Sequence, residues 1–238
     1  MATYLYCLRS DDHSVPAGLF GIDGAPVRSI HATRLIAWVS DLDGPSVDAT
    51  VDRVRAHDAV CAASVVVGET PLPIRFGQAF ADDAAVVEAV VARRHALEPR
   101  LERVAGCVEM RVVVTRGRES AEPAAPIGGD RSDGPVDGDS VEGPGTAFLR
   151  RLARTGRADI AREVGCEEVR HAVREQARGL IVDHQACEAA RGLAFFPVLV
   201  RRADVDRFRG AVGETLLSHA IDLSVLGPFA PYSFAGDA

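Results

Sequence analysis

The spacing of apolar residues predicts a mixture of strands and helices from the start of the chain. Two β-prone runs, Thr3–Leu8 and Leu35–Val39, predict strands, and the glycines between them indicate turns around one more short strand. From Val47 to Val65, apolar residues recur at spacings of three and four, which predicts an amphipathic helix. Asp58 falls on the apolar face of that helix, where an apolar residue is expected.

A strand, a second helix and another strand follow in the same half. Leu72–Phe76 is short, apolar and closed by Gly77, which predicts a strand. The next helix begins near Asp82, whose carboxylate can cap free amides, and should be kinked at Pro99. Met110–Thr115 predicts a buried strand. The order β, β, α, β, α, β predicts a ferredoxin-like sandwich, in which two helices cover one face of a four-stranded sheet.

The C-terminal part, residues 144–238, predicts a second α+β domain with long helices. Thr146–Ala190 is mostly helix-forming and is broken by glycines. Leu193–Val200 predicts an apolar strand in which Pro197 favours an edge position or a bulge. Asp204 then caps a short helix, and Ile221–Leu226 predicts the last strand.

The segment 117–143 differs in composition from both flanking parts. It holds six Gly, three Pro, seven acidic residues, two Arg and no aromatic residue, so it accounts for −5 of the formal charge of −7. Such a segment cannot bury enough apolar surface to offset the entropy of ordering it. We therefore predict a disordered acidic linker between an N-terminal domain, residues 1–116, and a C-terminal domain, residues 144–238.

Composition narrows the classes of partner. Outside the linker the chain is nearly neutral, aromatic residues make up only 5%, and no run of basic residues forms a stripe that could follow phosphates, so nucleic acid is not expected. The five cysteines are widely spaced without C-x-x-C, which disfavours a disulfide framework and structural zinc. No signal-peptide pattern or apolar stretch of about 18 residues is present, so we expect a cytoplasmic protein without a membrane partner.

Candidate chemistry is sparse. Glycine-rich phosphate loops and nucleophile elbows are missing from the sequence. His184 and Cys187 could be half of a metal site, but no second pair stands at a usual spacing. His57 and Asp58 are neighbours on a helix and point in different directions, so they do not form a base with its orienting acid. We expect no catalytic residues, no metal and no cofactor.

Six segments spread along the chain are informative when taken together. They are Tyr4-Leu5-Tyr6, His57–Val60, Leu72-Pro73-Ile74-Arg75-Phe76-Gly77, Val108–Val112, Ala194–Val200 and Gly227-Pro228-Phe229-Ala230-Pro231-Tyr232-Ser233-Phe234. In this order, and over essentially the whole chain, they resemble the gas vesicle accessory proteins of the GvpL/GvpF family. Two departures are small: Gln78 where the family usually has Thr, and Phe229-Ala230 where it usually has Trp-Pro.

The resemblance implies an N-terminal ferredoxin-like domain, a C-terminal α+β domain and a role in gas vesicle assembly. It implies contacts with the small hydrophobic shell protein and other accessory proteins, in the cytoplasm and at the vesicle, and no enzymatic activity. A transient partner with its own apolar surface could limit aggregation of the shell protein before the wall forms. The binding site would be an apolar patch or an open sheet edge.

Two segments of this sequence are candidates for that contact. The C-terminal one brings three aromatic residues together, although it could instead fold back and staple the domains. The candidate protein-binding residues are Leu72, Pro73, Arg75, Phe76, Gly77, Pro228, Phe229, Pro231, Tyr232 and Phe234.

Two other classes remain open. An RNA-binding ferredoxin-like module would need exposed aromatic residues on its sheet, which Tyr4 and Tyr6 could supply. An enzyme of unknown type would rest on Arg75, His57 and Asp58, which lie in neighbouring segments.

Overall fold

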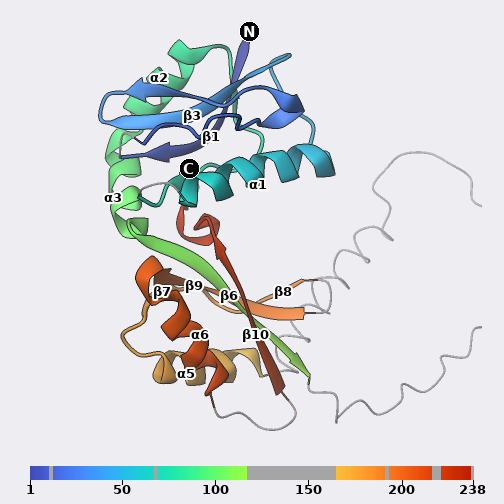
Figure 1. Cartoon of the computed structure of the whole chain (residues 1–238), viewed down its shortest axis with the longest axis vertical. Coiled ribbons are helices and arrows are strands. Elements are labelled where there is room, and N and C mark those ends of the chain that lie inside the picture. The colour runs from blue at the N-terminus through green and yellow to red at the C-terminus, as the bar shows by residue number, and fades with distance from the viewer. Residues whose placement is uncertain (11–12, 67–68, 117–164, 191–192, 216–220, 237–238) are drawn as a thin grey trace, which may run out of the picture.

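The computed structural model describes residues 1–10, 13–66, 69–116, 165–190, 193–215 and 221–236. The predicted linker, and the part of the predicted helical stretch that precedes residue 165, lie outside these residues. Two antiparallel sheets with their own helices are stacked along the long axis of the molecule (Figure 1). We call them the first lobe and the second lobe. The α+β class expected from the sequence is confirmed.

The first lobe is built on five strands. These are β1 (Ala2–Arg9), β2 (Arg28–Ala32), β3 (Leu35–Leu42), β4 (Leu72–Pro73) and β5 (Ala79–Phe80). The sheet has the order β2-β3-β1-β4, and β5 also pairs with β1. Strands were expected at the sites of β1 and β3, and a further short strand is present as β2. The strand expected over Leu72–Phe76 is limited to two residues.

Helices cover both faces of this sheet, so the expectation that two helices cover one face is wrong. Alternate residues of β1 and β3 enter two apolar clusters. Tyr4 and Tyr6 lie in the cluster of α1 (Val51–Val66), whereas Leu5 lies in that of α2 (Asp83–Ala92) and α3 (Arg94–Val104). Both faces of β1 and β3 are therefore buried, which explains why these strands are apolar at nearly every position.

Helix α1 is rotated relative to the face predicted from the apolar pattern. Asp58 and Val54 are exposed, and the buried face includes His57, Val60 and Cys61. The spacing of apolar residues could not predict this buried face, because the polar residue His57 lies at its centre.

The second long helix is interrupted earlier than expected. The carboxylate of Asp82 accepts a hydrogen bond from the Ala85 amide at 2.9 Å and caps α2, as predicted. The break between α2 and α3 lies at Arg93, with φ −100° and ψ 5°, while Pro99 lies inside α3.

The second lobe contains a sheet of order β10-β6-β9-β7, in which β8 also pairs with β9. The strands are β6 (Cys107–Arg116), β7 (Ile181–His184), β8 (Glu188–Ala190), β9 (Leu193–Arg201) and β10 (Ile221–Phe229). The strand expected at Met110–Thr115 is thus β6, and the expectation that it completes the first sheet is wrong. Its partners are β9 and β10, which come more than 75 residues later.

One face of the second sheet packs on α5 (Cys166–Gln176) and α6 (Val205–Gly213). Among the described elements, β6, α5, β7, β9, α6 and β10 follow in the order β, α, β, β, α, β, with short β8 between β7 and β9. This order differs from the order β, β, α, β, α, β that the sequence predicted for the N-terminal half. The carboxylate of Asp204 at the start of α6 accepts from Arg207 at 2.8 Å and makes no capping bond to the backbone.

Two further expectations for the second lobe are corrected. Strand β9 is internal, so Pro197 is not at an edge; it lies opposite the connection between β7 and β8, and its carbonyl accepts from the Gln185 amide. Cys166 and Cys187 form a disulfide with a Cα–Cα distance of 6.2 Å. Residues 21 apart meet here because the start of α5 lies beside that connection, which spacing alone could not reveal.

Candidate functional site

The two lobes meet around His57, near the middle of α1. Its Nε2 lies 3.0 Å from the carbonyl oxygen of Ile74 and its Nδ1 lies 2.9 Å from the hydroxyl of Tyr4. Because a carbonyl only accepts, Nε2 carries the proton and Nδ1 accepts from Tyr4. The Tyr4 hydroxyl in turn accepts from the Gly77 amide at 3.0 Å. The Leu72–Gly77 segment is thus held to α1 and β1 by one chain of hydrogen bonds.

Burial controls the ionisation of this cluster. Desolvation lowers the pKa of His57 and raises the pKa of Tyr4, Tyr232 and Cys61. The Cys61 thiol lies 3.7 Å from His57 Nε2, yet its raised pKa keeps it protonated. A nucleophilic cysteine requires a lowered pKa and access to solvent. This Cys–His pair is therefore part of the core. Asp58 is exposed, and its charge opposes the effect of burial on the pKa of His57.

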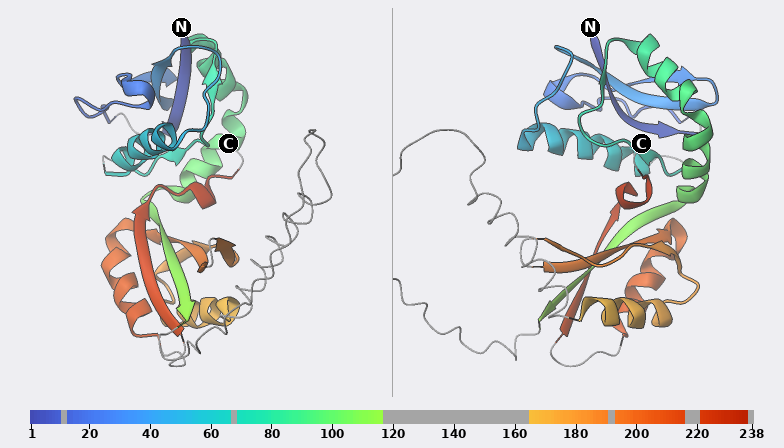
Figure 2. Two further views of the ribbon diagram at one scale, coloured as in Figure 1. Left: turned by 90° about the vertical axis from the view of Figure 1, so that its right-hand side faces the viewer. Right: turned by 180° about the vertical axis from the view of Figure 1, so that it is seen from behind.

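The C-terminal segment is packed between the lobes (Figure 2). The ring of Tyr232 lies 6.2 Å from the His57 ring, and Phe234 is buried in the cluster of α3. Glu109 on β6 is fully buried, and its carboxylate accepts from the Ser233 amide at 2.8 Å and the Ser233 hydroxyl at 3.1 Å. The segment therefore connects the first lobe, through His57 and α3, with the second sheet.

The structure places the candidate binding residues in different environments. Four of them are buried: Leu72, Pro73, Pro231 and Phe234. Phe76 and Tyr232 are half-buried against His57. The exposed ones, which a partner could reach, are Arg75, Gly77, Pro228 and Phe229.

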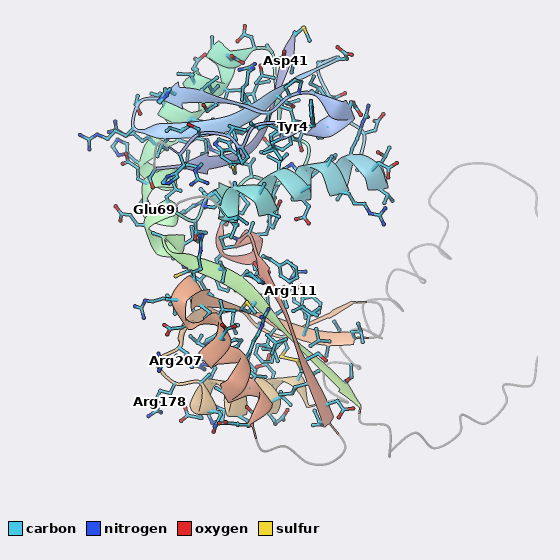
Figure 3. The ribbon with its side chains drawn as sticks, in the orientation of Figure 1. Tyr4, Asp41, Glu69, Arg111, Arg178 and Arg207 are labelled. Atoms are coloured by element: carbon cyan, nitrogen blue, oxygen red, sulfur yellow. A yellow bond between two sulfur atoms is a disulfide. The ribbon has the colours of Figure 1, made fainter. Side chains whose placement is uncertain are left out.

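Phe229 belongs to an apolar area on the second sheet, on the face opposite α5 and α6. The guanidinium of Arg111 lies over the rings of Phe229 and Phe195, at 5.4 and 5.8 Å (Figure 3). Leu226 pairs with Arg111 across β10 and β6 and is 50% exposed. We call the set Arg111, Val113, Leu193, Phe195, Leu226 and Phe229 the open face.

The charge within the open face is compensated. The Nε of Arg111 lies 3.0 Å from the buried carboxylate of Glu109. The surface is therefore apolar with one neutralised arginine, and aromatic and arginine side chains are the types enriched at the centres of protein interfaces. The sequence pattern indicated Phe229 as a candidate binding residue, but not Arg111, Phe195 or Leu226. Apolar residues at consecutive positions of β6 and β9, which fill both faces of a strand, were the available signal.

The described residues do not form a surface suited to stacking RNA bases or an arrangement suited to catalysis. Tyr4 and Tyr6 are completely buried, so the idea that they form a base-stacking surface is wrong. The described residues contain no group of His, Cys, Asp and Glu that could hold a metal ion. In a hollow of about 330 Å³ beside α5, charged side chains pair within the protein, Arg178 with Glu175 and Asp183 with Arg103.

Among the described helices, none has the length and apolarity needed to cross a membrane.

Comparison with known proteins identifies one family. The model of the family "Gas vesicle synthesis protein GvpL/GvpF" matches residues 2–236. Gas vesicle protein L of Streptomyces sp. (strain CB03234) is 29% identical, over 99% of this chain and 93% of its own length. Gas vesicle protein F of the same strain is 30% identical, over 98% and 99%.

Solved structures agree with this assignment at the level of the fold. The crystal structure of gas vesicle protein GvpF from Anabaena sp. PCC7120 has a TM-score of 0.68 at 17% identity and covers 98% of this chain and 95% of its own. GvpF from Microcystis aeruginosa has a TM-score of 0.66 at 16% identity and covers 98% of both chains. The chain belongs to the gas vesicle synthesis protein GvpL/GvpF family.

Proposed function

We propose that this protein is a gas vesicle assembly factor that binds the small hydrophobic shell protein through the open face and limits its aggregation during nucleation of the vesicle. The observation that carries the proposal is the apolar surface around Arg111 in a chain of this family. A shell protein that packs into a gas-filled wall presents apolar surface before assembly, and a matching apolar face on a partner can cover it.

The rest of the chain supports a binding role. Cys61 and His57 lie next to each other where the two lobes meet. Both are buried, and the raised pKa of the Cys61 thiol makes it unreactive. We infer that the protein has no catalytic activity and no cofactor, works in the cytoplasm and at the vesicle, and also contacts other accessory proteins. The strand order of the second lobe further supports a ferredoxin-like domain there rather than in the N-terminal half.

Co-expression with the shell protein encoded in the same gene cluster tests the proposal. The shell protein should become soluble and co-elute in pull-down and size-exclusion chromatography. Leu226→Arg introduces a charge into the open face and should abolish co-elution. Val182→Arg is the matched control, because Val182 is 44% exposed but lies on β7, outside the open face. Equal loss of binding in both variants, or none in either, would contradict a role for the open face.

A further inference from the structure

The edge strands of the two sheets differ in how they are protected from pairing with a strand of another molecule. Edge strands usually carry charged side chains, irregularities or short lengths that prevent pairing with another strand. Strand β2 has Arg28, which forms ion pairs with Asp83 and Asp41 at 2.7 and 2.8 Å. Strands β4 and β5 have two residues each, and the edge formed by β7 and β8 is interrupted between them.

Strand β10 has none of these protections over most of its length. Its pairing with β6 is regular from Ile221 to Leu226, and Asp222 is the only charged residue in that stretch. Among the edge strands that the structure describes, β10 combines a long and continuous stretch with few charged residues. Six residues in extended conformation span about 20 Å, which is the length of an average strand.

The far end of this edge is defined by the structure. The register shifts between Leu226 and Phe229, and the Gly227 carbonyl accepts from the guanidinium of Arg209 on α6 at 2.6 Å. An added strand would therefore pair with residues 221–226 and stop at Gly227.

The side chains along the edge favour an apolar partner. Ser224 and Leu226 point to the open face and continue the surface around Arg111 and Phe195. Leu223 and Val225 are half-buried on the opposite face. A strand added at β10 would form backbone hydrogen bonds with the edge and lay alternate side chains across the open face, as in recognition by β-strand addition. The charge of Arg111 is compensated by Glu109, so Asp222 at the start of the edge is the one charge that an added strand would meet there.

We propose that residues 221–226 of β10 accept an extended, uncharged, apolar strand of the shell protein, which extends the second sheet by one strand. This inference rests on the proposed function, since it names the structural element by which the shell protein is bound. It adds a backbone contact that the open face alone would not require.

Hydrogen exchange of the β10 amides in the free protein and in the co-purified complex tests the inference. Neighbouring residues of a strand direct their amides to opposite sides, so alternate β10 amides face solvent in the free protein. These should exchange rapidly alone and at least about tenfold more slowly in the complex. Unchanged exchange in a complex that does form would overturn the inference and leave the proposed function intact.

The free protein gives a second readout. Solvent-facing amides that are already protected in a monomer would mean that another segment of this chain occupies the edge. Protection that appears only in a homodimer would mean that a second copy does. Either result overturns the inference.

Proline substitutions provide an independent test. Leu223→Pro and Ser224→Pro each remove one backbone amide. Because the two residues are adjacent, one of these amides is directed to β6 and the other to solvent. The variant that lacks the solvent-facing amide, here called the outward variant, should keep the melting temperature within a few degrees. It should bind the shell protein at least about fivefold more weakly, as expected for one lost backbone hydrogen bond and a steric block. Unaltered affinity in the folded outward variant would overturn the inference. If neither variant folds, the exchange measurement decides. Failure of the wild-type protein to bind the shell protein at all would instead reject the proposed function.

Discussion

The buried carboxylate of Glu109 accepts two hydrogen bonds from Ser233, although 124 residues separate them in the sequence. Glu109 belongs to the central strand β6, and Ser233 belongs to the C-terminal segment that also contacts His57 through Tyr232. The pair therefore connects the second sheet to the first lobe. It also gives the fully buried carboxylate of Glu109 hydrogen-bond partners, without which its burial would be costly.

Replacement of Glu109 should weaken this connection. Glu109→Gln removes the charge and turns one acceptor into a donor facing Arg111 or Ser233. We expect a loss of about 1–3 kcal/mol in the free energy of unfolding, the usual cost of breaking a buried charged hydrogen bond. Urea denaturation measures the loss, and limited proteolysis should show earlier cleavage of the C-terminal segment. Glu188→Gln, at an exposed residue of β8, is the control and should have little effect.

Substitutions at two glycines with positive φ, Gly77 and Gly227, allow the cost of backbone strain to be compared with the cost of steric overlap. Gly77 has φ 100° and no heavy atom within 4 Å of the position that a Cβ would take, whereas Gly227 has φ 120° and a Cβ there would lie 2.8 Å from the Glu109 carbonyl oxygen. Gly77→Ala should cost about 1–2 kcal/mol in the free energy of unfolding through strain alone. Gly227→Ala should cost about 1–3 kcal/mol more. Equal losses in thermal denaturation would show that the backbone at Gly227 moves freely.

Local sequence signals predicted most of the strands and the cap of α2, but not which strands pair with one another. The apolar runs at β1, β3, β6 and β9 were visible because each strand is buried on at least one face, and that at β10 because alternate residues are half-buried. The sheet that β6 joins was not predictable, since its neighbours lie beyond residue 190 and pairing depends on the whole fold. The site was predicted in part for the same reason. Phe229 was found in the terminal motif, but its contact with Arg111 joins two distant strands.

His57 should make stability depend on pH. Burial holds its pKa below the ordinary value of 6.5, and protonation of Nδ1 would break the hydrogen bond from Tyr4. The unfolded chain binds the proton more readily, so the contribution of neutral His57 is complete above pH 6.5 and is lost as the pH falls through its lower folded pKa.

Urea denaturation at pH 7.5 and pH 5.5 checks this expectation. Wild-type protein should lose more stability on acidification than His57→Gln, which cannot ionise. His171→Gln is the control, because His171 is exposed on α5 and should leave the pH dependence as in the wild type. An identical pH dependence in His57→Gln and wild type would show that other groups cause it.

The disulfide between Cys166 and Cys187 should stabilise the second lobe in its oxidised form. It closes a loop of 21 residues, and loop entropy predicts about 3 kcal/mol. The bond fixes the start of α5 to the connection between β7 and β8, where Glu167 also accepts from the Cys187 amide at 3.1 Å. Reduction should therefore lower the melting temperature of the second lobe while the fold is retained, because that hydrogen bond and the apolar contacts of α5 persist.

Comparison of wild type and Cys166→Ser, each with and without reductant, measures this effect. Reductant should destabilise only the wild-type protein, to the level of the variant. Cys7, Cys61 and Cys107 are buried and not disulfide-bonded, so they should not form alternative disulfides in the folded chain. A reductant effect of equal size in Cys166→Ser would mean that some other cysteine pair is responsible. No effect in either protein would mean that the chain holds these residues together without the bond.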